Sequence, residues 1–330
     1  MKTKKKILIV GLGSMGMRRL RLLRTLFCDA DICSVDSRRD RLDTAAQAHS
    51  IKTFNDLPSA VEVFNPDISF VSTSPLSHSH IVNLLLKAGS HVFSEIDLVD
   101  DGYEQNTGLA DKTGLVLFLS STQMYRREIR YIMKCVKNIE GNCYYRYHVG
   151  QYLPDWHPWE CYTEFFVGDK RTNGCREIFA IELPWIISSF GKVKSLTTVS
   201  NKLSELAIDY PDSYAVTIVH ETGVVGQIMV DVVSRKAVRD FELVSEDTYL
   251  HWGGTPDSLS IYNPSDKKSE NVKLYDEVIS DPRYSDNIVE NAYVEEMENF
   301  FKVIEGKEKP RHTYAKNKII LNLIDEIEGF

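Results

Sequence analysis

The sequence predicts an α/β protein with a doubly wound parallel sheet, followed by an α+β domain with an open, mostly antiparallel sheet. Three observations support this prediction. Short, mainly apolar runs alternate with helical patterns up to residue 121, as buried parallel strands and their crossover helices do. A glycine-rich turn follows the first of these runs. Beyond residue 121 the strand-like segments are regularly spaced, which is typical of an antiparallel sheet.

The first strand and its turn carry the most specific local signal. Ile7–Val10 is an apolar strand, and the residues after it fit G-x-G-x-x-G. We expect Gly11 to allow the tight turn, Gly13 to let a pyrophosphate approach the backbone, and Gly16 to let the next helix pack closely. The unpaired N–H groups of that helix would hold the phosphates. The predicted phosphate-binding residues are Gly11, Gly13, Ser14, Met15 and Gly16.

The second strand, residues 32–35, ends in Asp36. This acid lies about 20 residues after the last glycine, where a carboxylate accepts hydrogen bonds from the adenosine ribose hydroxyls. The pattern therefore predicts a dinucleotide cofactor. Asp36 repels a 2′-phosphate and favours NAD, whereas Arg38 and Arg39 could hold that phosphate or stack on adenine. We expect NAD, with NADP as the alternative.

The alternation continues to the end of the first domain, which we place at residues 1–121. Further strands are predicted at 51–54, 68–71, 91–94 and 115–119, and helices at 41–49, 56–64, 80–88 and 102–112. Asp36, Thr73 and Glu95 each lie at the carboxyl end of a strand. Ligands of a doubly wound sheet bind at these ends, so these residues are candidates for the cofactor site.

The second domain is placed at residues 122–330, and its last helix is a candidate to pack back on the first domain. Helices are predicted at 125–136, 178–190, 287–304 and 314–327. Strands are predicted at 143–152, 193–200, 214–220, 224–233, 239–245 and 248–252, with loops and edge strands over 255–286.

Composition narrows the possible functions. The net charge of −8 and the lack of a basic stripe argue against nucleic-acid binding. No segment approaches the roughly 20 apolar residues of a membrane span, and the first apolar run is too short for a secretory signal. Six scattered cysteines without C-x-x-C pairs fit reduced thiols of a cytoplasmic protein. His78 and His80 alone are too few for zinc, so no metal is expected.

Together these segments resemble the Gfo/Idh/MocA family of NAD(P)-dependent oxidoreductases over most of the chain. The resemblance rests on ILIVGLGSMG, on FVSTSPLSHSHIVNLLLKAGSHVFSEIDLVD, and on the closing AYVEEMENFFKVIEGKEKPRHTYAKNKIILNLIDEIE. Thr73 and His78 occupy the family's T-P-N-x-x-H positions, and Glu95 opens its E-K-P motif. The resemblance implies that these three residues line the cofactor site of a Rossmann domain, although His78 could equally cap or pack its helix.

The resemblance also implies a reaction and a quaternary structure. Family members transfer a hydride between nicotinamide and a secondary carbinol or ketone of sugars, nucleotide sugars, inositols or related polyols. The face of the second sheet often mediates their oligomerisation, so we expect a homo-oligomer with a small sugar-type substrate.

Two departures from the family concern catalysis. The E-K-P lysine falls on Ile96, which can neither donate nor relay a proton. The D-x-x-x-H pair of the second domain is also absent; Glu177 and Glu182 lie in that stretch instead. A buried carboxylate has a raised pKa that suits general acid–base catalysis, although Arg176 could pair with either one. Glu95 is a further candidate.

An aromatic loop, residues 151–162, could supply the substrate site. Aromatic faces with a few fixed polar groups suit sugar rings, although a packed core loop is the alternative interpretation. The substrate-binding candidates are His148, Tyr152, Asp155, Trp156 and Trp159. His157 or His148 is the candidate for a substitute proton-transfer residue.

These observations favour an NAD(P)-dependent oxidoreductase acting on a sugar or polyol. The alternatives are a dinucleotide- or sugar-binding protein without catalysis, and an NAD-assisted epimerase or lyase without net redox change.

Overall fold

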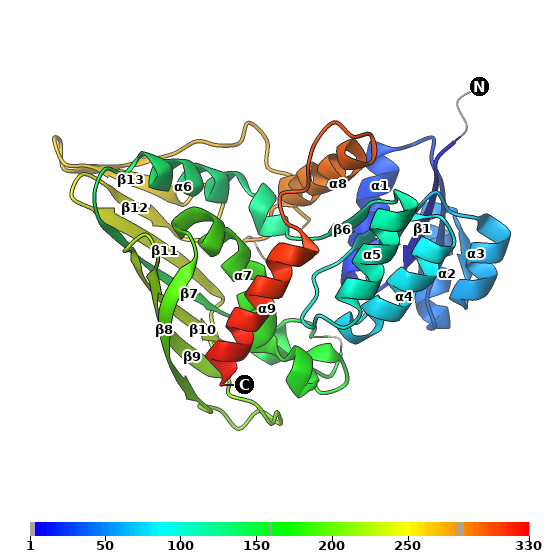
Figure 1. The fold of residues 1–330 in the computed structure, drawn as a ribbon, viewed down its shortest axis with the longest axis horizontal. Helices are drawn as coiled ribbons and strands as arrows, with labels where there is room; N and C mark the ends of the chain where they lie inside the picture. The colour runs from blue at the N-terminus through cyan, green and yellow to red at the C-terminus, as the bar shows by residue number, and fades with distance from the viewer. Residues whose placement is uncertain (1–3, 159, 282, 284, 286, 330) are drawn as a thin grey trace. The chain divides into compact units, whose positions relative to one another are not determined.

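The computed structural model describes residues 4–158, 160–281, 283, 285 and 287–329, which form two compact units (Figure 1). The first unit contains the described residues up to Ser120 together with Met297–Ala315. The second contains Ser121–Glu296 and the described residues from Lys316 onward. Helix α8 (Glu290–Ile304) is therefore divided between the units, whereas α9 (Tyr314–Glu328) belongs mostly to the second.

The first unit is built on a six-stranded sheet whose strands all pair in parallel, in the order β3-β2-β1-β4-β5-β6. The strands are β1 (Lys6–Val10), β2 (Asp31–Val35), β3 (Lys52–Phe54), β4 (Ile68–Val71), β5 (His91–Ser94) and β6 (Leu117–Leu119). The order reverses direction between β1 and β4, which creates a crevice at the carboxyl ends of these two strands. The predicted doubly wound sheet is confirmed.

Helices pack on both faces of this sheet. They are α1 (Ser14–Leu26), α2 (Arg39–His49), α3 (Leu57–Phe64), α4 (Pro75–Lys87) and α5 (Tyr103–Thr113). Side chains from α3, α4 and α5 form one apolar core with β1 and β2. Elsewhere in this unit, the ring of Phe300 from α8 lies 5.4–5.6 Å from the rings of Phe70, Phe93 and Phe118. The second half of α8 thus completes this unit.

The second unit is built on an eight-stranded sheet in the order β14-β13-β12-β11-β7-β10-β9-β8. Its strands are β7 (Cys143–Gly150), β8 (Val193–Asn201), β9 (Ser213–His220), β10 (Val225–Asp231), β11 (Val238–Ser245), β12 (Tyr249–Trp252), β13 (Leu259–Asn263) and β14 (Lys268–Asn271). Only β7 and β10 pair in parallel among these strands. The predicted mostly antiparallel sheet is confirmed.

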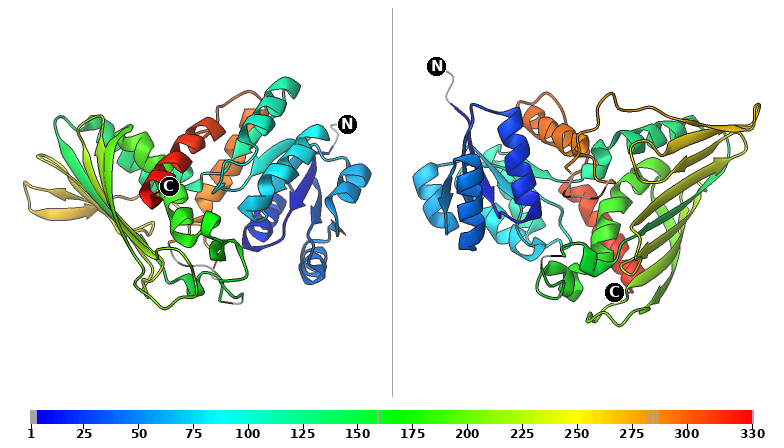
Figure 2. Two further views of the ribbon diagram at one scale, coloured as in Figure 1. Left: turned by 60° about the horizontal axis from the view of Figure 1, so that its bottom comes forward. Right: turned by 180° about the vertical axis from the view of Figure 1, so that it is seen from behind.

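One face of this sheet is covered and the other is open (Figures 1 and 2). Helices α6 (Arg127–Asn138) and α7 (Gly174–Phe190) lie on the covered side with α9. Side chains alternate accordingly along β7: Tyr145 and Tyr147 are buried, whereas Tyr144 and Arg146 are exposed. Short 3-10 helices connect the elements: η1 (Thr122–Tyr125), η2 (Leu153–Asp155), η3 (Phe166–Gly168) and η4 (Lys170–Thr172).

Two helices begin earlier than predicted. Helix α4 starts at Pro75 rather than at residue 80, because proline suits the first position of a helix. Helix α7 starts at Gly174 rather than at residue 178, because the Asn173 side chain accepts a hydrogen bond from the N–H of Arg176 (2.7 Å) and caps the first turn.

Candidate functional site

The glycine turn between β1 and α1 forms a cradle that only glycine permits at two positions. Gly11 has a φ of +90°, and a Cβ there would lie 2.5 Å from the carbonyl oxygen of Ser72. A Cβ on Gly16 would overlap the carbonyl oxygen of Gly11. Among the described residues, no side chain caps α1 and no acid lies in its first turn. This uncapped N-terminus, which begins at Ser14 and Met15, fits a pyrophosphate.

Asp36 is held against this cradle. Its buried carboxylate accepts hydrogen bonds from the backbone N–H of Leu12 (2.6 Å) and of Arg38 (2.8 Å). The guanidinium of Arg41 lies 3.9 Å from the same carboxylate. The Arg38 guanidinium instead pairs with Asp40 at 2.6 Å. The structure thus brings Asp36 to the adenosine end of the cradle, as expected for a ribose ligand.

The carboxyl end of β4 is fixed by a buried histidine. Nδ1 of His78 lies 2.6 Å from the Asp97 carboxylate, and Nε2 lies 3.0 Å from the carbonyl oxygen of Thr73. The carboxylate and the carbonyl oxygen are both acceptors, and protonation of the ring lets both of its nitrogens donate. Burial lowers the pKa of His78, but Asp97 and the two hydrogen bonds outweigh it, so that the pKa is raised on balance. His78 therefore holds Thr73 beside the glycine turn.

Glu95 lies at the carboxyl end of β5 in a buried ion pair. Its two carboxylate oxygens accept hydrogen bonds from Arg19 of α1 at 2.7 and 3.1 Å. The guanidinium of Arg19 also stacks over the ring of Phe93, 4.5 Å from its centroid. These contacts favour a structural role for Glu95, whose catalytic and cofactor roles stay predictions. The next residue, Ile96, is partly exposed between buried Glu95 and buried Asp97.

Glu182 lies between α7 and the covered face of the second sheet. It is buried and accepts hydrogen bonds from three donors, a number that nearly saturates a carboxylate. The donors are Tyr147 (2.7 Å), Trp185 (2.8 Å) and Arg239 (2.6 Å). This arrangement favours a packing role, and proton transfer by Glu182 stays a prediction.

Glu177, one turn earlier on α7, differs from the other two carboxylates. Its Oε2 atom is buried and has no hydrogen-bond partner among the described residues. Burial raises the pKa of Glu177 to about 7. Arg176 pairs instead with Glu328 (2.5 Å) and Asp325 (2.7 Å) of α9. Glu177 thus combines a carboxylate oxygen without a hydrogen-bond partner in the described part of the chain with a pKa in the range of a general acid or base.

The aromatic loop lies against the start of α7. The ring of Trp156 reaches to 3.5 Å from the Cβ position of Gly174, and its indole N–H donates to the carbonyl of Gln151 (3.2 Å). The guanidinium of Arg235, in the turn after β10, lies 4.0 Å from the ring centroid of Tyr152. Two aromatic side chains of the predicted substrate site therefore gather at the carboxyl ends of the parallel strands β7 and β10.

The other predicted residues of this loop differ in exposure. Asp155 is exposed, and His157 packs edge-on against Phe165 with ring centroids 5.0 Å apart. Trp159 lies outside the described residues.

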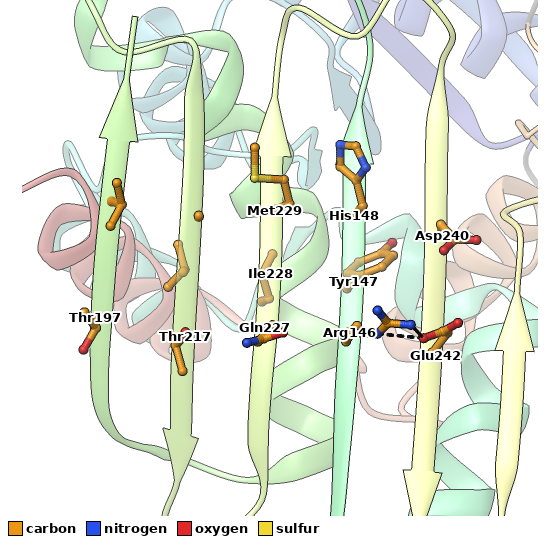
Figure 3. A pocket seen from close by; sticks show the side chains of 13 residues that line it. Arg146, Tyr147, His148, Thr197, Thr217, Gln227, Ile228, Met229, Asp240 and Glu242 are labelled. Atoms are coloured by element: carbon orange, nitrogen blue, oxygen red, sulfur yellow. Dashed lines mark hydrogen bonds and ion pairs between the residues drawn. The ribbon is translucent and has the colours of Figure 1, made fainter. Parts of the chain in front are cut away.

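His148 lies on the open face of the second sheet rather than on the side of Glu182. It is partly exposed, and its Nε2 is 2.7 Å from the carboxylate of Asp231. Figure 3 shows it beside Arg146, which pairs with Glu242, in a shallow hollow that crosses several strands. The structure therefore separates His148 from Glu182, which is bonded to the neighbouring Tyr147, because consecutive residues of a strand face opposite sides of the sheet.

Comparison with known proteins identifies the fold. Residues 5–138 match the Gfo/Idh/MocA family, described as an oxidoreductase family with an NAD-binding Rossmann fold. The matched residues include the whole parallel sheet and the helices between its strands. The predicted family, the oxidoreductase class and the NAD-type cofactor are thereby confirmed, and the cradle described above fits that cofactor. No curated protein sequence matches the chain.

Solved structures resemble the chain over nearly its full length. One is UDP-N-acetylglucosamine 3-dehydrogenase GnnA from Acidithiobacillus ferrooxidans, at 14% identity and TM-score 0.75 over 98% of this chain and 96% of that one. Another is myo-inositol 2-dehydrogenase from Lactobacillus plantarum, at 15% identity and TM-score 0.78 over 98% of this chain and 96% of that one. A third is biliverdin reductase from Synechocystis sp. PCC 6803 in complex with biliverdin and NADP+. Its identity is 14% and its TM-score 0.74, over 98% of this chain and 97% of that one. At these identities the likeness establishes the two-domain fold.

Sequence reasoning missed several residues that organise this candidate site. Arg19 precedes Leu23 by four residues and so lies on the inward stripe of α1; a charge there should have indicated a buried acid. Asp97 occupies the family's proline position, and its partner His78 is 19 residues away. Arg239, the partner of Glu182, gave no signal in the sequence.

Two features are absent from the described residues. Among the described residues, no group of three or more His, Cys, Asp or Glu side chains is placed to hold a metal ion. Within the same part of the chain, no helix has the length and apolar character needed to cross a membrane.

Proposed function

We propose that the protein is an NAD(P)-dependent oxidoreductase that interconverts a carbinol and a ketone on a sugar, nucleotide sugar or polyol. The observation that carries this proposal is the complete cradle of Gly11, Gly16 and the uncapped α1, with Asp36 fixed at its adenosine end. The substrate class is supported by two similar structures that are named as a nucleotide-sugar dehydrogenase and an inositol dehydrogenase. NAD is the expected cofactor because Asp36 is retained.

We assign to Glu177 the exchange of the proton of the substrate hydroxyl. When bound, the nicotinamide supplies or accepts the hydride, and a side chain must exchange the hydroxyl proton. Ile96 cannot do this. Glu95 and Glu182 are engaged by Arg19 and Arg239, whereas the Oε2 atom of Glu177 has no hydrogen-bond partner in the described part of the chain. Tyr152 and Trp156 would then stack on the sugar ring.

The test uses the purified protein, NAD+ or NADH, and a panel of sugars, UDP-sugars and inositols. Turnover is followed by the absorbance of reduced nicotinamide, and cofactor binding by its fluorescence. We expect turnover that Glu177→Gln reduces by about 100-fold or more while NADH binding is retained. The exposed Glu164→Gln is the matched control. A protein that binds neither cofactor would overturn the proposal.

A second candidate function is favoured by Ile96, which replaces the family's catalytic lysine with an apolar, partly exposed side chain. In this case the protein binds a dinucleotide or a sugar without dehydrogenase activity. Tight NADH binding with no turnover of any substrate in the panel would support it. Conversion of a sugar to its isomer with no change in NADH would indicate NAD-assisted epimerisation instead.

We also propose that the open sheet face joins copies of this chain. Four large apolar side chains on it are at least 39% exposed, namely Tyr144, Val199, Val225 and Tyr249. An exposed apolar sheet face of this kind marks an interface. Light scattering after size exclusion should give a dimer or larger for the native chain. Val199→Lys with Val225→Lys should give a folded monomer; an unchanged mass would exclude this face.

A further inference from the structure

The start of helix α7 has a single side chain that is not buried. From Thr172 to Ala180 every residue is buried except Glu177, which is partly exposed. The backbone N–H of Glu177 donates to the carbonyl oxygen of Asn173 (3.0 Å), which is the first hydrogen bond of the helix. Contacts that fix Asn173 and the turn after it therefore also fix the place of the Glu177 carboxyl group.

Glu328, the last residue of α9, holds this turn at two points, where α9 lies alongside α7 (Figure 1). Its Oε1 accepts a hydrogen bond from the side-chain amide of Asn173 (2.7 Å), and its Oε2 accepts one from the guanidinium of Arg176 (2.5 Å). The Glu328 side chain is only 3% exposed. Burial raises the pKa of Glu328, and the hydrogen bonds from Asn173 and Arg176 oppose this rise. One carboxylate thus joins the N-cap of α7 to the third residue after it.

Arg176 precedes Glu177 in the chain, and α9 engages its guanidinium at two acids. The second acid is Asp325, at 2.7 Å, which is 44% exposed. Solvent screens the charge of this exposed partner, so the buried Glu328 contributes most of the charge that balances the guanidinium. Without that charge the buried guanidinium would need another acceptor. The Oε2 atom of Glu177 has no hydrogen-bond partner in the described part of the chain.

Two further titratable groups belong to this turn or contact it. The hydroxyl of Tyr210 accepts a hydrogen bond from the N–H of Gly174 (3.4 Å), and the charge of Glu177 acts on it. The thiol of Cys175 is buried within the turn. Burial raises the pKa of both groups, so that both are neutral at neutral pH. The charges carried by the turn itself are therefore those of Arg176 and Glu177.

We propose that Glu328 is a positioning residue for the proton exchange of Glu177. It holds the first turn of α7 through Asn173, and it keeps the Arg176 guanidinium bound to α9, so that this cation does not pair with the carboxyl group that exchanges the proton. Such a pair would stabilise the ionised carboxylate, which could then no longer deliver a proton at neutral pH. This inference rests on the proposed function, which assigns the proton exchange to Glu177.

The first measurement needs no substrate. In the whole protein labelled with 13C at the glutamate carboxyl groups, the Glu177 resonance is identified by its loss in Glu177→Gln, and its titration gives the pKa. Burial raises this pKa to about 7 in the native chain. Glu328→Gln should lower it by roughly one pH unit or more, because a nearby cation lowers the pKa of a carboxyl group by about 1–3 units. The amide oxygen of glutamine can still accept from Asn173.

The second measurement is the pH profile of kcat for ketone reduction by NADH, with the substrate that the panel identifies. In the native chain kcat should fall above a pH of about 7, because Glu177 must be protonated to act as the acid. In Glu328→Gln the fall should begin roughly one pH unit lower, which is about a tenfold loss of kcat at pH 8. KM and the affinity for NADH should be unchanged.

Two control variants separate this role from a structural one. Asp325→Asn removes the same charge from the same helix at an exposed position, and it should change the titration and the profile much less. Arg176→Met with Glu328→Gln should return both to their native values, because the cation is gone. A structural defect would not be restored by removing a second side chain. If Glu328→Gln does not fold, Glu328→Asp, which is shorter by one methylene, should lower the pKa in the same direction.

The outcomes separate this inference from the proposed function. If Glu177→Gln keeps its turnover, the proton assignment of the proposed function fails, and this inference fails with it. If Glu177→Gln loses turnover but Glu328→Gln leaves the titration of Glu177 unchanged, or lowers kcat equally at every pH, only the role of Glu328 is overturned. The same holds if Asp325→Asn has an equal effect or if the double variant is not restored. Circular dichroism of each variant verifies the fold.

Discussion

Replacing Glu177 with glutamine should stabilise the protein at high pH while removing its activity. The folded state raises the pKa of this carboxyl from 4.5 to about 7 because it is buried. Below pH 4.5 the folded and unfolded states both hold the proton, so burial carries no ionisation cost. Between 4.5 and about 7 only the folded state keeps it, so stability falls as the pH rises.

The magnitude follows from these two values. Each pH unit between them corresponds to about 1.4 kcal/mol, so the native chain loses about 3 kcal/mol by pH 8 and only about 1 kcal/mol by pH 5. Glutamine does not titrate and avoids this loss. Glu177→Gln should therefore be more stable than the native chain by about 3 kcal/mol at pH 8 and by about 1 kcal/mol at pH 5.

Urea unfolding at the two pH values measures the difference directly, with the exposed Glu164→Gln as the control that should show no pH-dependent change. A gain of the same size at both pH values would refute the assignment of a raised pKa to Glu177. A carboxylate that costs stability and yet is required for turnover would be the expected signature of a catalytic group.

Further substitutions, at Arg19, Gly16 and Gly108, test the first unit. Arg19→Met leaves the buried carboxylate of Glu95 without its cation and should lower the free energy of unfolding in urea by about 3–5 kcal/mol. The double variant Arg19→Met with Glu95→Gln should restore most of this loss. Equal losses in the single and double variants would exclude the pairing. Gly16→Ala forces a Cβ into the carbonyl oxygen of Gly11 and should cost about 1–3 kcal/mol and weaken NADH binding. Gly108→Ala, in open space on α5, should instead stabilise by about 0.5–1 kcal/mol.

The cofactor cradle could be predicted because its parts are contiguous in the chain. The apolar strand, the glycine turn and the helix follow one another directly, and Asp36 ends the next strand. Each of these features is set by local chemistry, namely by backbone conformation at Gly11 and by the unpaired N–H groups at the start of α1. The alternation of strands and helices was readable for the same reason.

The sequence could not show which glutamates are paired with an arginine, because the partners are distant in the chain. Arg19 lies 76 residues from Glu95, and Arg239 lies 57 residues from Glu182. Nothing near Glu95 or Glu182 in the sequence indicates that a distant arginine pairs with it. Glu177 differs from Glu182 by five positions in the same apolar stretch, and only the packing of α7 on the sheet shows that one is satisfied and the other is not.

The division of α8 between the units has a consequence for how the protein is made. The phenylalanine cluster on one face of the first sheet is completed by Phe300, which is translated long after the strands that carry Phe70 and Phe93. Until that helix leaves the ribosome, the nascent N-terminal half exposes a stack of aromatic rings. A fragment ending at Ser120 would therefore lack part of the core of the nucleotide-binding unit. We expect the nascent chain to bind chaperones that shield apolar surface.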